Sequence, residues 1–100
     1  MKDVKTNAEL NEVLENNPRV LVYWSASWCA PCRRLKPQIE QADEKLTNVT
    51  FVRIMTDEAD LELVSDYNIS AVPQLFEYEE GKQVGPITPG PWQKIVSQLA

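Results

Sequence analysis

Residues 19–32 read RVLVYWSASWCAPC, and this stretch predicts a buried strand followed at once by a reactive site. From Arg19 to Trp24 the side chains are nearly all apolar, as expected for a strand buried on both faces. Cys29 and Cys32, the two cysteines of the chain, come next with two residues between them. A helix that begins at this motif directs its positive end and unpaired N–H groups toward the first thiol, which stabilises a thiolate. Because the thiolate is the nucleophile of thiol–disulfide exchange, the stretch favours redox chemistry.

Length and charge limit the classes of protein to consider. A chain of 100 residues can bury its own core, so we expect a single domain over residues 1–100. Ten basic and 15 acidic side chains give a net charge of −5, which predicts that the protein does not bind nucleic acid. No apolar stretch is long enough to span a membrane, and residues 1–5 lack the apolar segment of a signal peptide. We therefore expect no membrane partner and a cytoplasmic location, where a CxxC pair is more often catalytic or metal-binding than a structural disulfide.

The first half of the chain predicts two helices beside the apolar strand. Residues 6–9 have the form of a capping box, and the helix that follows has an apolar face of Leu10, Val13 and Leu14. The helix that begins at the cysteine motif has one buried stripe, formed by Leu35, Ile39, Ala42 and Leu46. Pro37 lies inside this helix and is expected to kink it. A short strand over residues 1–5 is the weakest of the local patterns.

The second half predicts a strand, a helix, a hairpin and a final helix. Residues 49–56 form the strand, and residues 57–60 place acids in the first turn of the helix, whose apolar face is Leu61, Val64 and Tyr67. Residues 74–78 and 82–87 form a β-hairpin around Gly81. The final helix opens at Pro91 and buries Trp92, Ile95, Val96 and Leu99. The order β-α-β-α-β-α-β-β-α predicts an α/β fold with a mixed central sheet and helices on both faces.

Several separate segments make the chain resemble the thioredoxin family. Residues 25–32, SASWCAPC, resemble the family's active-site run, which usually has Gly where Ala30 stands. Pro37 matches the proline that kinks the family's active-site helix, and Gly81 matches its hairpin glycine. Residues 69–73, ISAVP, resemble the segment that ends in the family's cis-proline. The resemblance therefore implies the thioredoxin fold, a cis bond between Val72 and Pro73, and close approach of this segment to the cysteines.

The resemblance also implies a function, that of a protein disulfide reductase without a bound cofactor. Cys29, at the helix N-terminus and partly exposed, is expected to attack a substrate disulfide, and the more buried Cys32 to resolve the mixed disulfide. The predicted substrate-binding residues are Trp28, Ala30, Pro31, Val72, Pro73 and Gly90. The implied partners are disulfide-containing proteins and a thioredoxin reductase or equivalent electron donor, and we expect a monomer.

The chain differs from the family's pattern at three positions. Tyr23 stands where the family usually has a buried Asp that takes part in proton transfer, and Arg53 stands where the family has a Lys. Both are therefore candidates for proton transfer or for tuning the thiols. Tyr23 either is a core residue whose hydroxyl finds a partner, with Arg53 as the candidate, or positions a water near Cys32, and we favour the first. The family's groove glycine corresponds to Pro89 without a gap or to Gly90 after an insertion.

Three other functions are compatible with the sequence. Zinc sites of this kind take about four protein ligands, whereas the chain offers two cysteines and no histidine, so a metal site requires two chains. The domain could be a docking module or a subunit of a larger enzyme, although docking alone needs neither cysteine. It could also be an oxidant or isomerase, but the Ala30-Pro31 pair is closer to the Gly-Pro pair of reductants than to the His-containing pairs of oxidants.

Overall fold

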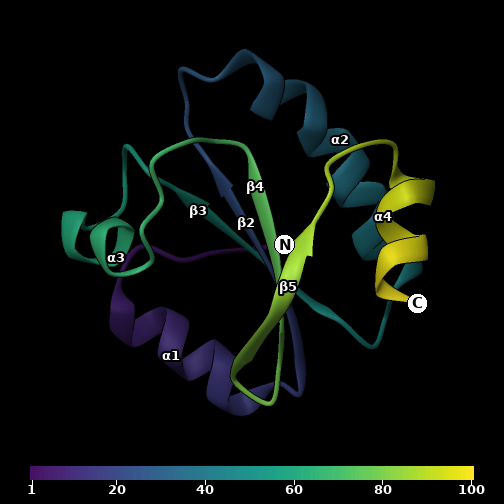
Figure 1. The fold of residues 1–100 in the computed structure, drawn as a ribbon, viewed down its shortest axis with the longest axis horizontal. Helices are drawn as coiled ribbons and strands as arrows, with labels where there is room; N and C mark the ends of the chain where they lie inside the picture. The colour runs from purple at the N-terminus through teal and green to yellow at the C-terminus, as the bar shows by residue number, and fades with distance from the viewer.

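The computed structural model describes residues 1–100 and confirms the predicted order of elements. Five strands alternate with four helices in an α/β arrangement (Figure 1). The elements are β1 (Lys2–Asp3), α1 (Asn7–Asn16), β2 (Arg19–Ser25), α2 (Ala30–Lys45), β3 (Thr50–Met55), α3 (Leu61–Asp66), β4 (Gln74–Glu79), β5 (Lys82–Ile87) and α4 (Trp92–Leu99).

The five strands form one mixed sheet in the order β1-β3-β2-β4-β5. β2 lies at the centre, parallel to β3 and antiparallel to β4. Figure 1 shows α1 and α3 on one side of the sheet and α2 and α4 on the other. The central position explains why the residues of β2 are apolar on both faces, since each face is covered by helices.

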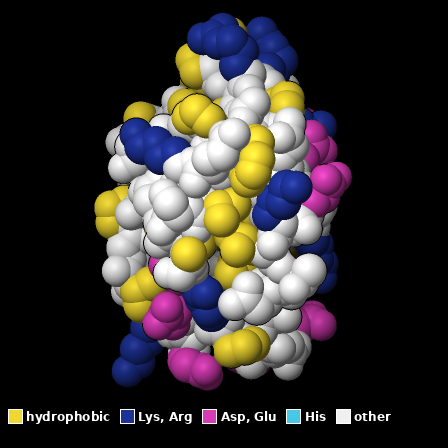
Figure 2. Space-filling view, turned by 90° about the vertical axis from the view of Figure 1, so that its right-hand side faces the viewer, with side chains coloured by type: hydrophobic (Ala, Val, Ile, Leu, Met, Phe, Trp, Pro, Cys, Tyr) yellow, Lys and Arg dark blue, Asp and Glu magenta, His cyan; other side chains and the backbone are white.

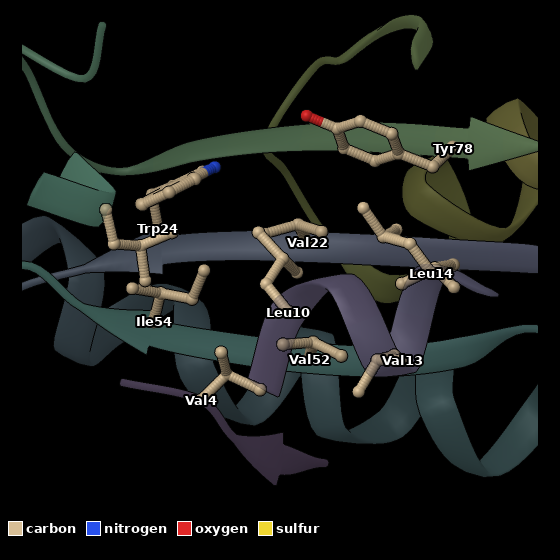
Figure 3. Packing of buried hydrophobic residues seen from close by; sticks show 11 residues of the cluster. Val4, Leu10, Val13, Leu14, Val22, Trp24, Val52, Ile54 and Tyr78 are labelled. Carbon is tan, nitrogen blue, oxygen red and sulfur yellow. The ribbon is translucent and has the colours of Figure 1, made fainter. Parts of the chain in front are cut away.

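Each face of the sheet carries its own hydrophobic core. On the side of α1 and α3, Leu10, Val13 and Leu14 of α1 pack against Val22 of β2 and Val52 of β3 (Figure 3). Trp24 belongs to the same core, fully buried as expected, with its ring 5.6 Å from that of Tyr67. The core on the other face is formed by α2 and α4 over β2, β3 and β4, with Leu21, Ile39 and Ile95 at its centre.

Local signals in the sequence account for the ends of several elements. Thr6 Oγ1 accepts a hydrogen bond from the N–H of Glu9 at 3.1 Å, which is the capping interaction predicted for α1. In the β4–β5 turn, Glu80 and Gly81 have φ angles of 51° and 78°, the left-handed pair that a two-residue hairpin turn requires. None of the helices is long and apolar enough to cross a membrane.

The prediction for α3 is wrong in its start and in part of its buried face, although Tyr67 packs against the core as predicted. The helix begins at Leu61, and the four residues before it are not in its first turn. Leu61 is 84% exposed, whereas Leu63, which the predicted face omitted, is fully buried. The cause is a turn after β3, in which the N–H of Ala59 bonds to the carbonyl of Met55 at 2.9 Å and that of Asp60 to Lys5 at 2.9 Å. The local bond and the long-range bond to Lys5 hold these residues outside the helix, which therefore starts at Leu61.

Candidate active site

The two cysteines lie where β2 passes into α2. β2 ends at Ser25, residues 26–28 form a short loop, and Cys29 is the N-cap of α2. Its sulfur accepts a hydrogen bond from the N–H of Cys32 at 3.2 Å, so the first turn of the helix directs a donor at Cys29 Sγ. The structure holds the pair as a Cys29–Cys32 disulfide. The spacing of the motif therefore places both sulfurs at one helix N-terminus, as predicted.

Cys29 is more deeply buried than we predicted. It is 4% exposed and Cys32 is 1% exposed, so the two thiols differ little in solvent contact in the disulfide form. Ala26 and Val72 pack around them. Trp28, in contrast, is 70% exposed beside Cys29, which suits a rim that receives substrate rather than a core side chain.

The loop before Cys29 is tied to the end of β3 by residues that the sequence analysis did not single out. The carboxylate of Asp57 accepts hydrogen bonds from both the N–H and the hydroxyl of Ser27. These bonds hold the pKa of Asp57 below its ordinary value, so the carboxylate is ionised at neutral pH. Arg33 donates to the carbonyl of Ser27 at 2.8 Å. The predicted topology could have indicated this contact, because β2 and β3 are neighbouring parallel strands whose carboxyl ends lie at the same edge of the sheet.

The segment before Pro73 lies against the cysteines although more than 40 residues separate them. The Val72–Pro73 peptide is cis, and the carbonyl oxygen of Val72 is 3.9 Å from Cys29 Sγ. The N–H and C=O of Val72 have no backbone hydrogen-bond partner. The backbone of Val72 is therefore free of backbone partners next to the reactive sulfur.

Two depressions lie near the disulfide, and residues next to the cysteines, rather than the cysteines themselves, line them. The first lies between Trp28, Asp57 and α3, and its wall includes residues 69–72. The second lies between the start of α2 and the β5–α4 connection and contains Pro31, Pro73 and Gly90. Pro89 and Gly90 both line the second depression, so this wall includes both candidates for the groove glycine. Five of the six predicted substrate-binding residues line these depressions, and Ala30 lines neither.

Comparison with known proteins identifies the family. The Thioredoxin family model matches residues 2–99 of the chain. The chain belongs to the thioredoxin family. The thioredoxin of Mycoplasmoides gallisepticum is 35% identical over 82 residues, which cover 82% of this chain and 81% of that protein. A solved structure of Plasmodium falciparum thioredoxin superposes with a TM-score of 0.89, at 26% identity and full coverage of both chains.

The family also supplies domains of longer proteins. The peptide-N(4)-(N-acetyl-beta-glucosaminyl)asparagine amidase of Caenorhabditis briggsae is 32% identical in an alignment 102 positions long, which covers 99% of this chain but 17% of that enzyme. The match to the family model and the thioredoxin relatives, together with the Cys29–Cys32 disulfide, assign the activity class of this chain. It is a thioredoxin-type protein disulfide oxidoreductase that works by thiol–disulfide exchange.

In this thioredoxin the hydroxyl of Tyr23 binds the active-site helix, and our prediction of Arg53 as its partner is wrong. The hydroxyl donates to the backbone carbonyl of Cys32 at 2.7 Å in a fully buried position. Arg53 instead forms an ion pair with Asp3, its neighbour on β1, at 2.6 Å. Tyr23 and Arg53 are adjacent in register, but the ring points toward α2 while the guanidinium reaches the carboxylate at the sheet edge.

We expect Tyr23→Phe to lower stability but to spare exchange. Burial raises the pKa of the Tyr23 phenol above its ordinary value of 10, so it is protonated at neutral pH and cannot act as a base. Loss of the hydroxyl leaves the Cys32 carbonyl without this donor, which costs about 1 kcal/mol of unfolding free energy. Urea unfolding and the rate of disulfide reduction at pH 7 measure the two effects. A loss of activity as large as that caused by removing Cys32 would show that the phenol is catalytic.

Proposed function

We propose that this thioredoxin reduces protein disulfides, with Cys29 as the attacking thiol and Cys32 as the resolving thiol. The observation that carries this assignment is the position of Cys29 Sγ, which accepts the N–H of Cys32 at the N-terminus of α2. A helix N-terminus and a donor aimed at the sulfur stabilise a thiolate there. Cys32 is one turn further into the helix, where its sulfur can reach Cys29 to resolve the mixed disulfide.

The reaction proceeds in two exchanges. The Cys29 thiolate attacks one sulfur of the substrate disulfide, forms a mixed disulfide and releases the other substrate sulfur as a thiolate, which takes up a proton. Cys32, after losing its proton to water or to the departing thiolate, attacks Cys29 Sγ and releases the second substrate sulfur. The substrate gains two electrons and two protons, and Cys29 and Cys32 end as the disulfide seen in the structure.

The surfaces around the disulfide support binding of an extended substrate segment. The free backbone groups of Val72 can pair with such a segment as an added strand, a mode that gives affinity with little demand on sequence. Trp28 and Val72 flank Cys29 on one side, and Pro31, Pro73 and Gly90 border the second depression. Ala30 occupies the first helical position between the cysteines, where its backbone is held in the helix.

The proposed reductase needs a supply of electrons. A thioredoxin reductase or an equivalent dithiol donor returns Cys29 and Cys32 to the thiol form, so the protein carries electrons between that donor and its substrates. A compartment that keeps thiols reduced suits this cycle, and we place the protein in the cytoplasm. One chain supplies both cysteines, so the cycle requires only a monomer.

Reduction of insulin disulfides with dithiothreitol as donor tests the proposed function. We expect catalysed reduction and a potential for the Cys29–Cys32 pair near that of thioredoxin, about −270 mV. A reduction potential of about −120 mV, the value of a strong oxidant, would contradict the proposal that the protein acts as a reductant. Bound metal in protein purified without chelator distinguishes exchange from the metal-binding alternative, which predicts zinc held between two chains.

A further inference from the structure

The first depression beside the disulfide has a negative wall. Trp28, Val64 and Ile69 give it an apolar floor, and Asp57 lines it with an exposed, ionised carboxylate. Ser27 occupies part of the hydrogen-bonding capacity of Asp57, but a carboxylate has about four acceptor sites, so some remain free for a ligand. The adjoining residues Glu58, Asp60 and Glu62 are exposed as well and add negative charge to this side.

The second depression has a positive wall. Arg34 lines it together with Pro31, Pro73, Pro89 and Gly90. The side chain of Arg34 makes neither an ion pair nor a hydrogen bond within the chain. Gln38, also in the lining, is occupied by the N–H of Trp92 at 2.9 Å. Figure 2 shows Lys and Arg side chains gathered at the end of the molecule where α2 begins, above a line of hydrophobic side chains. The lining of the first depression therefore contributes a carboxylate, and the lining of the second contributes a guanidinium.

The backbone between the two depressions favours one direction of a bound segment. A residue that pairs antiparallel with Val72 can use both its N–H and its C=O. A parallel segment can use the same two groups, but it divides them between two of its residues through slanted bonds, and such pairing is slightly less stable per residue. Residues 69–72 line the negative depression, and Pro73 lines the positive one. An antiparallel segment thus enters over Arg34 and leaves over Asp57.

We propose that this thioredoxin selects substrate segments that carry acidic side chains before the reactive cysteine and basic side chains after it. Acidic side chains then lie near Arg34 and basic ones near Asp57. The inference rests on the proposed function, since it specifies the substrate of the same site. It differs from a simple effect of the net charge of −5, which would favour any basic segment whatever the order of its charges.

Two peptides of identical composition separate charge order from net charge. One has the order Glu-Glu-Cys-Lys-Lys and the other Lys-Lys-Cys-Glu-Glu, both with blocked ends and with the cysteine disulfide-bonded to 2-mercaptoethanol. Two like charges stand next to each other in each peptide because successive side chains of an extended segment point to opposite faces, so one of the two faces the protein. The rate of oxidation of reduced protein by each peptide is divided by the rate of the same peptide with dithiothreitol, which removes differences in intrinsic reactivity.

We expect the Glu-Glu-Cys-Lys-Lys peptide to react about fivefold faster at low salt, the effect of two partly exposed charge pairs. The ratio should approach one in about 1 M salt, where the screening length falls to about 3 Å. Arg34→Gln and Asp57→Asn should each lower the ratio, and the double variant should bring it to about one. Glu12→Gln on α1 and Lys82→Gln on β5, matched charge removals on distant elements, should leave it unchanged.

The outcomes separate this inference from the function on which it rests. Equal rates for the two peptides, faster reaction of the Lys-Lys-Cys-Glu-Glu peptide, or a ratio that either variant leaves unchanged would overturn the charge-order proposal. If insulin is reduced in the same preparation, the reductase function stands despite that result. If neither insulin nor any peptide is reduced, the proposed function itself fails.

Discussion

Cys29→Ser should abolish disulfide reduction, and Cys32→Ser should stop the reaction at the mixed disulfide. The hydroxyl of serine is not ionised at neutral pH, so the first variant has no nucleophile at the N-terminus of α2. The second variant keeps Cys29 and the helix that stabilises its thiolate but lacks the sulfur that resolves the intermediate. Insulin reduction should therefore be absent from both variants, and covalent complexes with substrate should accumulate only with Cys32→Ser.

Mass analysis tests this assignment of roles. Mixed disulfides with a disulfide-bearing peptide should be found at Cys29 of the Cys32→Ser variant, and excess dithiothreitol should reduce them and release the peptide. Brief, substoichiometric alkylation of the reduced wild-type protein should label Cys29 first. Preferential labelling of Cys32, or trapping by the Cys29→Ser variant, would reverse the two roles. A variant with both cysteines replaced by serine serves as the control, because any partner it retains binds by docking rather than by exchange.

Arg19→Met should lower the unfolding free energy by about 3 kcal/mol, a large share of the stability of a small domain. Arg19 donates to Glu77 at 2.7 Å and to the carbonyl of Leu99 at 2.5 Å. It therefore joins the start of β2 to the centre of β4 and also satisfies a carbonyl at the end of α4. The Glu77 side chain is only 11% exposed, so removing its partner leaves a charge with little access to water.

Urea unfolding of three variants separates the charge effect from lost packing. The double variant Arg19→Met/Glu77→Leu should recover part of the loss, because neither charge is then left unpaired. Lys82→Gln, which removes an exposed cation one strand away, should change stability by less than about 0.5 kcal/mol. A loss below about 0.5 kcal/mol for Arg19→Met would show that Glu77 is solvated well enough without its partner.

Local patterns were sufficient to predict most of the elements. The apolar run of β2, the capping box of α1 and the turn residues of the β4–β5 hairpin act within a few positions of the chain. The reactive site was accessible for the same reason, since Cys29 and Cys32 are close in sequence and the helix that stabilises the thiolate begins between them. The start of α3 could not be predicted from local patterns, because a hydrogen bond from the N–H of Asp60 to the carbonyl of Lys5 joins distant parts of the chain just before that helix.

The sequence by itself determined the order of helices and strands, the two-sided burial of β2 and the chemistry of the cysteine pair. Only the tertiary structure decided what surrounds that pair. Tyr23 binds the carbonyl of Cys32 rather than Arg53, and Asp57 anchors Ser27. The approach of Val72 to the reactive sulfur was implied by the family resemblance, and the structure adds its distance of 3.9 Å. These contacts join residues that are distant in sequence or depend on which way a buried side chain turns. Sequence periodicity specifies which face a residue occupies, but only packing of the complete chain selects its partner.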